Sequence, residues 1–208
     1  MSEAFNAERL TRLCDFLQQS PTPWHATQSM AERLEQAGFT RLEETANWQL
    51  VPGKRYYVTR NDSSVIAFQL PAGKLTSLRM LGAHTDSPGL RLKPNATQYS
   101  AGWLQLGVQV YGGVLLAPWF DRDLGLAGRV HVRHADGRLE SVLLNVARPI
   151  AMIPSLAIHM DRDVNAGRSI NPQTQMAPVL MQSDTAKLHE LLGQWLEEQH
   201  GLRAVEVV

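Results

Sequence analysis

The stretch Ser77-Leu-Arg-Met-Leu-Gly-Ala-His84-Thr-Asp86-Ser-Pro88 decides how this chain folds and what chemistry it carries. Residues 77–83 form a short apolar run, which predicts a largely buried β-strand that leads directly into His84. Sheets in α/β proteins bind ligands just beyond the carboxyl ends of their strands, where His84 is expected to lie. Asp86 could accept a hydrogen bond from the imidazole, as the carboxylate beside a zinc-bound histidine does. The same spacing also occurs where a strand-end histidine is followed by an ordinary Asx turn.

Two helices and a strand pair are predicted before this stretch. Leucines spaced three and four residues apart predict a helix over residues 10–17, and Thr22 as N-cap predicts a second helix that ends at Gly38. Residues 56–59 and 65–70 are rich in β-forming residues and flank a short polar turn. Helices followed by strands indicate a layered α/β arrangement.

The remainder of the chain has a more β-rich pattern. Residues 128–146 predict a hairpin with its turn at 135–137, and the polar segment 161–178 predicts a loop. Apolar residues at helical spacing predict a last helix that ends at Gly201. The final apolar residues, 204–208, have the character of a strand, and we expect a truncated chain because the sequence stops inside this run.

Composition excludes several classes of partner. Lys and Arg number 20 and Asp and Glu number 20, so the formal net charge is zero, and neither nucleic acid nor a membrane surface is an expected partner. The N-terminus lacks the features of a signal peptide, and no apolar run is long enough to span a membrane. The lone Cys14 fits a reducing compartment, so we expect a cytoplasmic protein.

Two further segments contain candidate residues. His159 lies in the apolar run Leu156-Ala-Ile-His-Met160, where the simplest interpretation is a core histidine with one satisfied hydrogen bond. Asp121-Arg122-Asp123 could form an acid pair, but adjacent opposite charges more often form a turn or a salt-bridge network.

Five blocks, in order, resemble the aspartyl aminopeptidase family, and the resemblance extends from about residue 10 to the end of the chain. Residues 81–94 are similar to the first metal motif of that family. The other blocks are Ser20-Pro-Thr-Pro-Trp-His25, Tyr111-Gly-Gly through Trp119-Phe-Asp-Arg-Asp-Leu124, Leu126-Ala-Gly-Arg-Val130 and Ile153-Pro-Ser-Leu-Ala-Ile-His159.

The resemblance implies a co-catalytic aminopeptidase with two zinc ions, which uses a metal-activated water to remove N-terminal, acidic residues from peptides. It implies an α/β zinc-peptidase core, partial here, with an inserted β-rich dimerisation domain. Residues 1–94 would be the N-terminal part of the core, and residues 95–208 the inserted domain. The expected partners are peptide substrates and copies of the same chain, in assemblies built from dimers that include a large tetrahedral form.

The resemblance also assigns roles to three residues. His84 would be a ligand of one zinc ion, and Asp86 would orient its ring. His159 would reach the active site of a neighbouring subunit and contact substrate there, or alternatively bind a metal. The family's remaining motifs begin with a Leu-Asp-Asn segment, which this chain lacks. The Glu-Glu pairs at 43–44 and 197–198 have the wrong following residues.

We therefore expect the other ligands and the general base beyond Val208, and we expect the chain alone to be inactive. Two other functions stay open. One is a different co-catalytic zinc amidohydrolase, and the other is a non-catalytic oligomerisation module.

Overall fold

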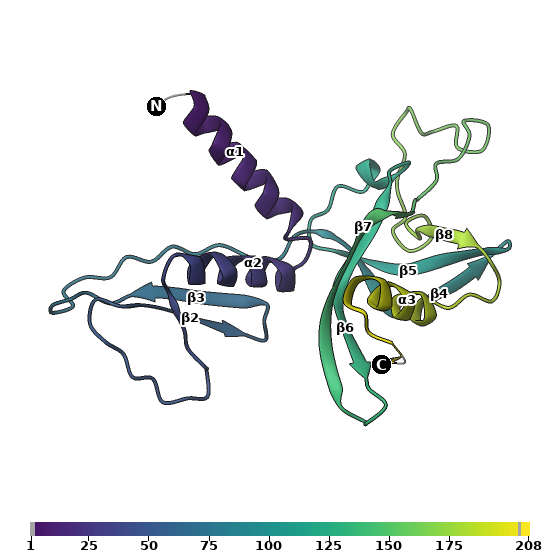
Figure 1. The fold of residues 1–208 in the computed structure, drawn as a ribbon. Coiled ribbons are helices and arrows are strands. Elements are labelled where there is room, and N and C mark those ends of the chain that lie inside the picture. The colour runs from purple at the N-terminus through teal and green to yellow at the C-terminus, as the bar shows by residue number, and fades with distance from the viewer. Residues whose placement is uncertain (1–2, 204) are drawn as a thin grey trace. The chain divides into compact units, whose positions relative to one another are not determined.

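The computed structural model describes residues 3–203 and 205–208, and the chain divides into two compact units (Figure 1). Unit 1 comprises residues 1–87 and unit 2 comprises residues 88–208. The boundary expected between residues 94 and 95 falls inside strand β4 (Gly89–Ser100). Pro94 lies where the pairing of β4 shifts in register, between Leu92 and Thr97.

Both predicted helices of unit 1 are confirmed, as α1 (Glu3–Gln18) and α2 (Pro23–Gln36). Thr22 caps α2, because its hydroxyl oxygen accepts the backbone N–H of His25. Gly38 follows the helix with φ +81°, a left-handed conformation that favours glycine. The guanidinium of Arg33 lies 4.8 Å from the centre of the Phe16 ring, which joins the two helices.

The sheet of unit 1 contains β1 (Thr40–Arg41), β2 (Arg55–Arg60) and β3 (Ser64–Gln69), in that order. Strands β2 and β3 form the predicted antiparallel pair, and Asn61 and Asp62 in its turn both have φ 51°. Figure 1 shows α2 beside β2 and β3. Tyr57 of β2 is fully buried, and its hydroxyl donates to Glu35 of α2 over 2.5 Å. Burial, followed by this hydrogen bond, raises the pKa of Tyr57 to about 12.

The strand predicted over residues 77–83 is wrong. This segment has no regular secondary structure, and Leu78, Met80 and Leu81 are 73%, 83% and 103% exposed. Within the described residues, β3 pairs only with β2, and no strand pairs with residues 77–83. A strand exists only when a neighbour satisfies its backbone N–H and C=O groups, so an apolar pattern alone cannot specify one.

Unit 2 contains two three-stranded sheets, a short 3₁₀ helix and one α-helix (Figure 1). The elements besides β4 are β5 (Trp103–Tyr111), η1 (Ala117–Trp119), β6 (Leu124–Arg133), β7 (Leu139–Ala151), β8 (Val179–Gln182), α3 (Leu188–His200) and β9 (Glu206–Val207). The first sheet has the order β4-β5-β8 and the second has the order β7-β6-β9. The hairpin and the last helix that the sequence predicts are confirmed as β6–β7 and α3.

The core of unit 2 lies between these sheets and α3. Fully or almost fully buried members of this core are Val132, Leu144, Val146, Ile153, Met176 and Leu196. Helix α3 also docks on β7 through polar contacts, since the Gln199 side chain exchanges hydrogen bonds with the backbone of Asn145 (2.8 and 3.3 Å). Gly201 ends α3 with φ +66°, as the sequence predicts.

No helix in the described part of the chain has both the length and the apolar character that crossing a membrane would require.

Candidate metal site

His84 lies in the segment that joins β3 to the end of unit 1, and its side chain is 78% exposed. It does not follow a formed strand, in contrast to the prediction. The segment is anchored next to it, because the Thr85 hydroxyl donates to the backbone oxygen of Ser63, 2.7 Å away, in the β2–β3 turn. The position of His84 within unit 1 is thereby tied to the hairpin.

The His84 ring is held through a single nitrogen. Nδ1 lies 2.6 Å from the backbone carbonyl oxygen of Asp86 and 3.4 Å from its carboxylate oxygen Oδ1. A carbonyl oxygen can only accept, so Nδ1 carries the hydrogen, and in the neutral ring Nε2 then keeps its lone pair. This tautomer is the one in which Nε2 can bind a metal ion. The carbonyl makes the short contact predicted for the Asp86 carboxylate, and the carboxylate lies farther off.

The described residues do not form a complete metal site. Among them no group of three or more His, Cys, Asp and Glu side chains is placed to hold a metal ion. Zinc in proteins takes about four ligands, of which a catalytic site draws three from the protein. His84 could serve as one zinc ligand and Asp86 as the carboxylate that supports it. The described residues do not supply the full set of ligands that a zinc ion needs.

His159 lies in unit 2 and is exposed, so the interpretation as a core histidine is wrong. It belongs to a turn in which the Met160 backbone N–H donates to the Ala157 carbonyl over 2.8 Å. The apolar neighbours are exposed too, with Leu156 at 51%, Ile158 at 47% and Met160 at 74%. The apolar run that suggested burial is a surface of unit 2.

Asp121 holds the start of this turn segment in place. Its carboxylate accepts the backbone N–H of Ser155 over 2.8 Å, and its own N–H donates to Ile153 over 2.9 Å. Hydrogen bonding by the Ser155 side chain, followed by that of its backbone N–H, lowers the pKa of Asp121. Asp121 therefore joins the sequence block at 119–124 to the block at 153–159, which is a structural role.

Arg168 is a supporting residue that the sequence did not indicate. Its guanidinium lies 4.4 Å from the centre of the Phe120 ring, and its Nε is 3.1 Å from Asp161. Both charged side chains are largely buried. Arg168 comes from the polar segment 161–178, where no local pattern distinguishes it from the other charged residues, and only its packing on Phe120 reveals it.

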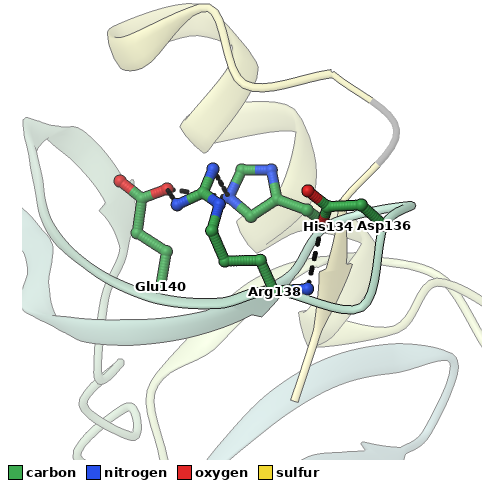
Figure 2. A network of polar contacts seen from close by, with 4 residues as sticks. All are labelled: His134, Asp136, Arg138 and Glu140. Carbon is green, nitrogen blue, oxygen red and sulfur yellow. Dashed lines mark hydrogen bonds and ion pairs between the residues drawn. The ribbon is translucent and has the colours of Figure 1, made fainter.

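A second cluster of titratable side chains lies at the tip of the β6–β7 hairpin (Figure 2). His134 Nε2 lies 2.7 Å from Glu140, and Arg138 Nη1 donates to the same Glu140 oxygen over 2.9 Å. The Asp136 carboxylate accepts the backbone N–H of Arg138 over 2.9 Å. The contacts with His134 and then Arg138 lower the pKa of Glu140. A guanidinium within the cluster repels cations, so the cluster stabilises the hairpin and is not a metal site.

The chain is similar to known aminopeptidases along almost its whole length. The family model described as aminopeptidase I zinc metalloprotease (M18) matches residues 16–205. A protein of Pseudomonas putida (strain GB-1), named "Probable M18 family aminopeptidase 2", is 54% identical over 209 residues. The matched region is 98% of this chain and 48% of that relative, so the chain spans about half the length of the curated relatives it matches.

Solved structures show the same likeness. A chain of the cryo-EM structure of the Ape4 and Nbr1 complex superposes with a TM-score of 0.83 at 37% identity, over 93% of this chain and 41% of that one. A chain of the S. cerevisiae mApe1 dodecamer superposes with a TM-score of 0.73 at 25% identity, over 95% of this chain and 45% of that one.

Proposed function

The chain belongs to the M18 family of aminopeptidases, and from this premise we propose that it contributes the first metal-ligand segment of a zinc aminopeptidase. The proposed reaction is hydrolysis of the first peptide bond of a peptide, with preference for an acidic N-terminal residue. One observation carries the proposal. His84, within the region that matches the family, has its Nδ1 hydrogen-bonded and its Nε2 in the tautomer that can bind zinc.

We assign His84 Nε2 to one of two zinc ions in the complete active site. The Asp86 carbonyl fixes the ring, and the Asp86 carboxylate stabilises the positive charge that metal binding places on the imidazole. A bound zinc ion supplies the Lewis acidity for peptide hydrolysis. The described residues hold and orient His84, and no three candidate ligands come together among them.

For His159 we propose a role across a subunit boundary in a homo-oligomer built from dimers. Its exposure among exposed apolar side chains supports a position at a subunit contact. The fold that the chain shares with the S. cerevisiae mApe1 dodecamer supports a large assembly, of which a tetrahedral arrangement of dimers is our specific proposal. There His159 contacts the substrate in the neighbouring active site, and zinc ligation by His159 is the alternative.

A second proposal concerns the function of the 208-residue chain by itself. Because no three candidate ligands come together in the described residues, we propose that the chain alone has no peptidase activity and holds no pair of zinc ions. Alone, it would act as an oligomerisation module. The free, exposed thiol of Cys14 supports a reducing compartment such as the cytoplasm.

The test uses a chimera in which residues 1–208 are followed by the second half of the P. putida relative. We expect the chimera to bind two zinc ions and to cleave an aspartyl substrate faster than a leucyl one. His84→Ala should abolish activity and remove about one equivalent of zinc. The matched control is His189→Ala, which changes an exposed histidine on α3 and should leave both unchanged. Full activity of the His84→Ala chimera would exclude the proposed site.

A further inference from the structure

His159 lies on a turn, formed by residues 155–161, that its own side chains do not hold to the body of unit 2. The three large apolar side chains of the turn are 47–74% exposed. Within the turn, the backbone N–H groups of Met160 and Asp161 both donate to the Ala157 carbonyl, over 2.8 and 3.2 Å. These two bonds shape the turn but do not attach it to the rest of unit 2. The placement of the turn therefore depends on contacts at its two ends.

The first end of the turn is attached to Asp121. The Asp121 carboxylate accepts the backbone N–H of Ser155 over 2.8 Å. The backbone of Asp121 has φ +54°, a left-handed conformation that is uncommon for residues other than glycine. Its N–H donates to the Ile153 carbonyl over 2.9 Å, which holds this conformation in place. Asp121 is thus a fixed point of attachment.

The second end of the turn is attached to Arg168. Arg168 Nε lies 3.1 Å from Asp161 Oδ2, and the two side chains are only 13% and 16% exposed. The Arg168 guanidinium also lies 4.4 Å from the centre of the Phe120 ring, and Phe120 packs against the core of unit 2. Because Phe120 and Asp121 are consecutive in the chain, both ends of the turn are attached at neighbouring positions.

The contact between Arg168 and Asp161 depends on charge. The buried Nε makes no hydrogen bond to any described residue, so the attraction between the two charges holds the pair. Removal of one partner of a largely buried pair leaves the other charge buried and unpaired. Arginine can stack its planar guanidinium on an aromatic ring while it pairs with a carboxylate, which lysine cannot do in the same way. The pair therefore favours a single arrangement of the turn.

We infer that Arg168 is the positioning residue for His159. By pairing with Asp161 and stacking on Phe120, Arg168 closes the base of the turn and fixes the direction in which the turn presents His159 to the neighbouring active site. A residue that contacts substrate needs a defined position, because a misplacement of about 1 Å can slow a reaction by on the order of 100-fold. The inference rests on the cross-subunit role proposed for His159, and it assigns Arg168 no contact of its own with substrate or metal.

A role confined to stabilising unit 2 is the alternative, and it differs in its effect on activity. A positioning residue acts through His159 alone, so its loss has no further effect on turnover once the His159 ring has been removed. A residue that stabilises unit 2 in general would lower turnover by the same factor whether or not the His159 ring is present. The double variant therefore separates the two roles.

Amide hydrogen exchange of the 208-residue chain tests the attachment of the turn. In Arg168→Met and in Asp161→Asn, we expect the Met160 amide to exchange on the order of 10-fold faster, because the turn is released at its second end. The matched control is Arg148→Met, which breaks an ion pair with Glu198 whose side chains are 54% and 55% exposed. It should change the exchange of Met160 by less than about 2-fold. If Arg168→Met unfolds unit 2, Asp161→Asn decides, since it changes the charge and almost nothing of the shape.

Turnover of the aspartyl substrate by the chimera tests the action through His159. We expect Arg168→Met to lower kcat by on the order of 10-fold when His159 is present, and by less than about 2-fold in the His159→Ala chimera. Unchanged exchange of Met160 in both charge variants would overturn the inference, and so would an equal loss of kcat in the two backgrounds. Full kcat in His159→Ala would reject the role proposed for His159 itself. Low kcat in His159→Ala together with full kcat in Arg168→Met would reject only the inference about Arg168.

Discussion

Replacing Asp86 by asparagine in the chimera should weaken zinc binding by a limited and calculable factor. The substitution keeps the backbone carbonyl that lies 2.6 Å from His84 Nδ1, so the ring stays oriented. It removes only the negative charge of the carboxylate, whose oxygen Oδ1 lies 3.4 Å from the same nitrogen. The expected loss is therefore the electrostatic part of the interaction alone.

The distance sets the size of that loss. Two unit charges 3.4 Å apart attract by about 1.2 kcal/mol in bulk water, or about 8-fold in affinity. The Asp86 side chain is 38% exposed, so the effective dielectric constant is lower than that of water. An effective dielectric constant half that of water doubles the attraction to about 2.4 kcal/mol, or about 60-fold in affinity. We expect a loss between these limits, which overlap the range of about 10–100-fold seen when residues that support metal ligands are changed.

Competition with a chromophoric chelator measures the zinc affinity of the Asp86→Asn and His84→Ala chimeras side by side. Asp15→Asn, an exposed carboxylate of α1, is the matched control and should leave the affinity unchanged. A loss below about 2-fold in Asp86→Asn would show that the carboxylate does not support the ligand. A loss as large as that of His84→Ala would show that the carboxylate itself binds the metal.

Three other predictions test the fold and the subunit contact. Leu196→Ala should lower the free energy of unfolding of unit 2 by about 2–5 kcal/mol, and Leu139→Ala by less than about 0.5 kcal/mol, in urea titrations; equal losses would contradict the assigned core. Because burial raises the pKa of Tyr57 from 10.0 to about 12, the folded state holds this proton more tightly. Stability should therefore be independent of this group below about pH 10 and fall towards pH 12, and Tyr57→Phe should remove that slope. A chimera carrying His159→Ala and one carrying His84→Ala should regain activity when they are mixed and exchange subunits, because a mixed dimer then contains one site with both histidines intact. Subunit exchange without return of activity would reject the cross-subunit role.

Local signals in the sequence predicted the elements that need only local interactions. The cap at Thr22 uses a hydroxyl and an N–H three residues apart, and the turns at Asn61-Asp62 and Gly137 use conformations that these residues adopt readily. The spacing of His84 and Asp86 likewise predicted a contact between the two residues, although the Asp86 backbone carbonyl makes the short contact and the carboxylate lies farther off. In each case the interacting atoms are a few residues apart.

Features that depend on distant partners were not predicted. An apolar pattern over residues 77–83 indicates a strand, but no strand among the described residues pairs with that segment. The packing of Arg168 on Phe120 joins segments far apart in the sequence, and no spacing rule anticipates it. The apolar neighbours of His159 suggested burial from the residues alone, but Leu156, Ile158 and Met160 are exposed.

Anomalous diffraction at the zinc edge from crystals of the chimera tests the central claim most directly. We predict a zinc peak about 2.0–2.1 Å from His84 Nε2, with the hydrogen bond from Nδ1 to the Asp86 carbonyl retained. A chimera with a full complement of zinc in which His84 Nε2 lies beyond coordination distance of every zinc ion would contradict the assignment.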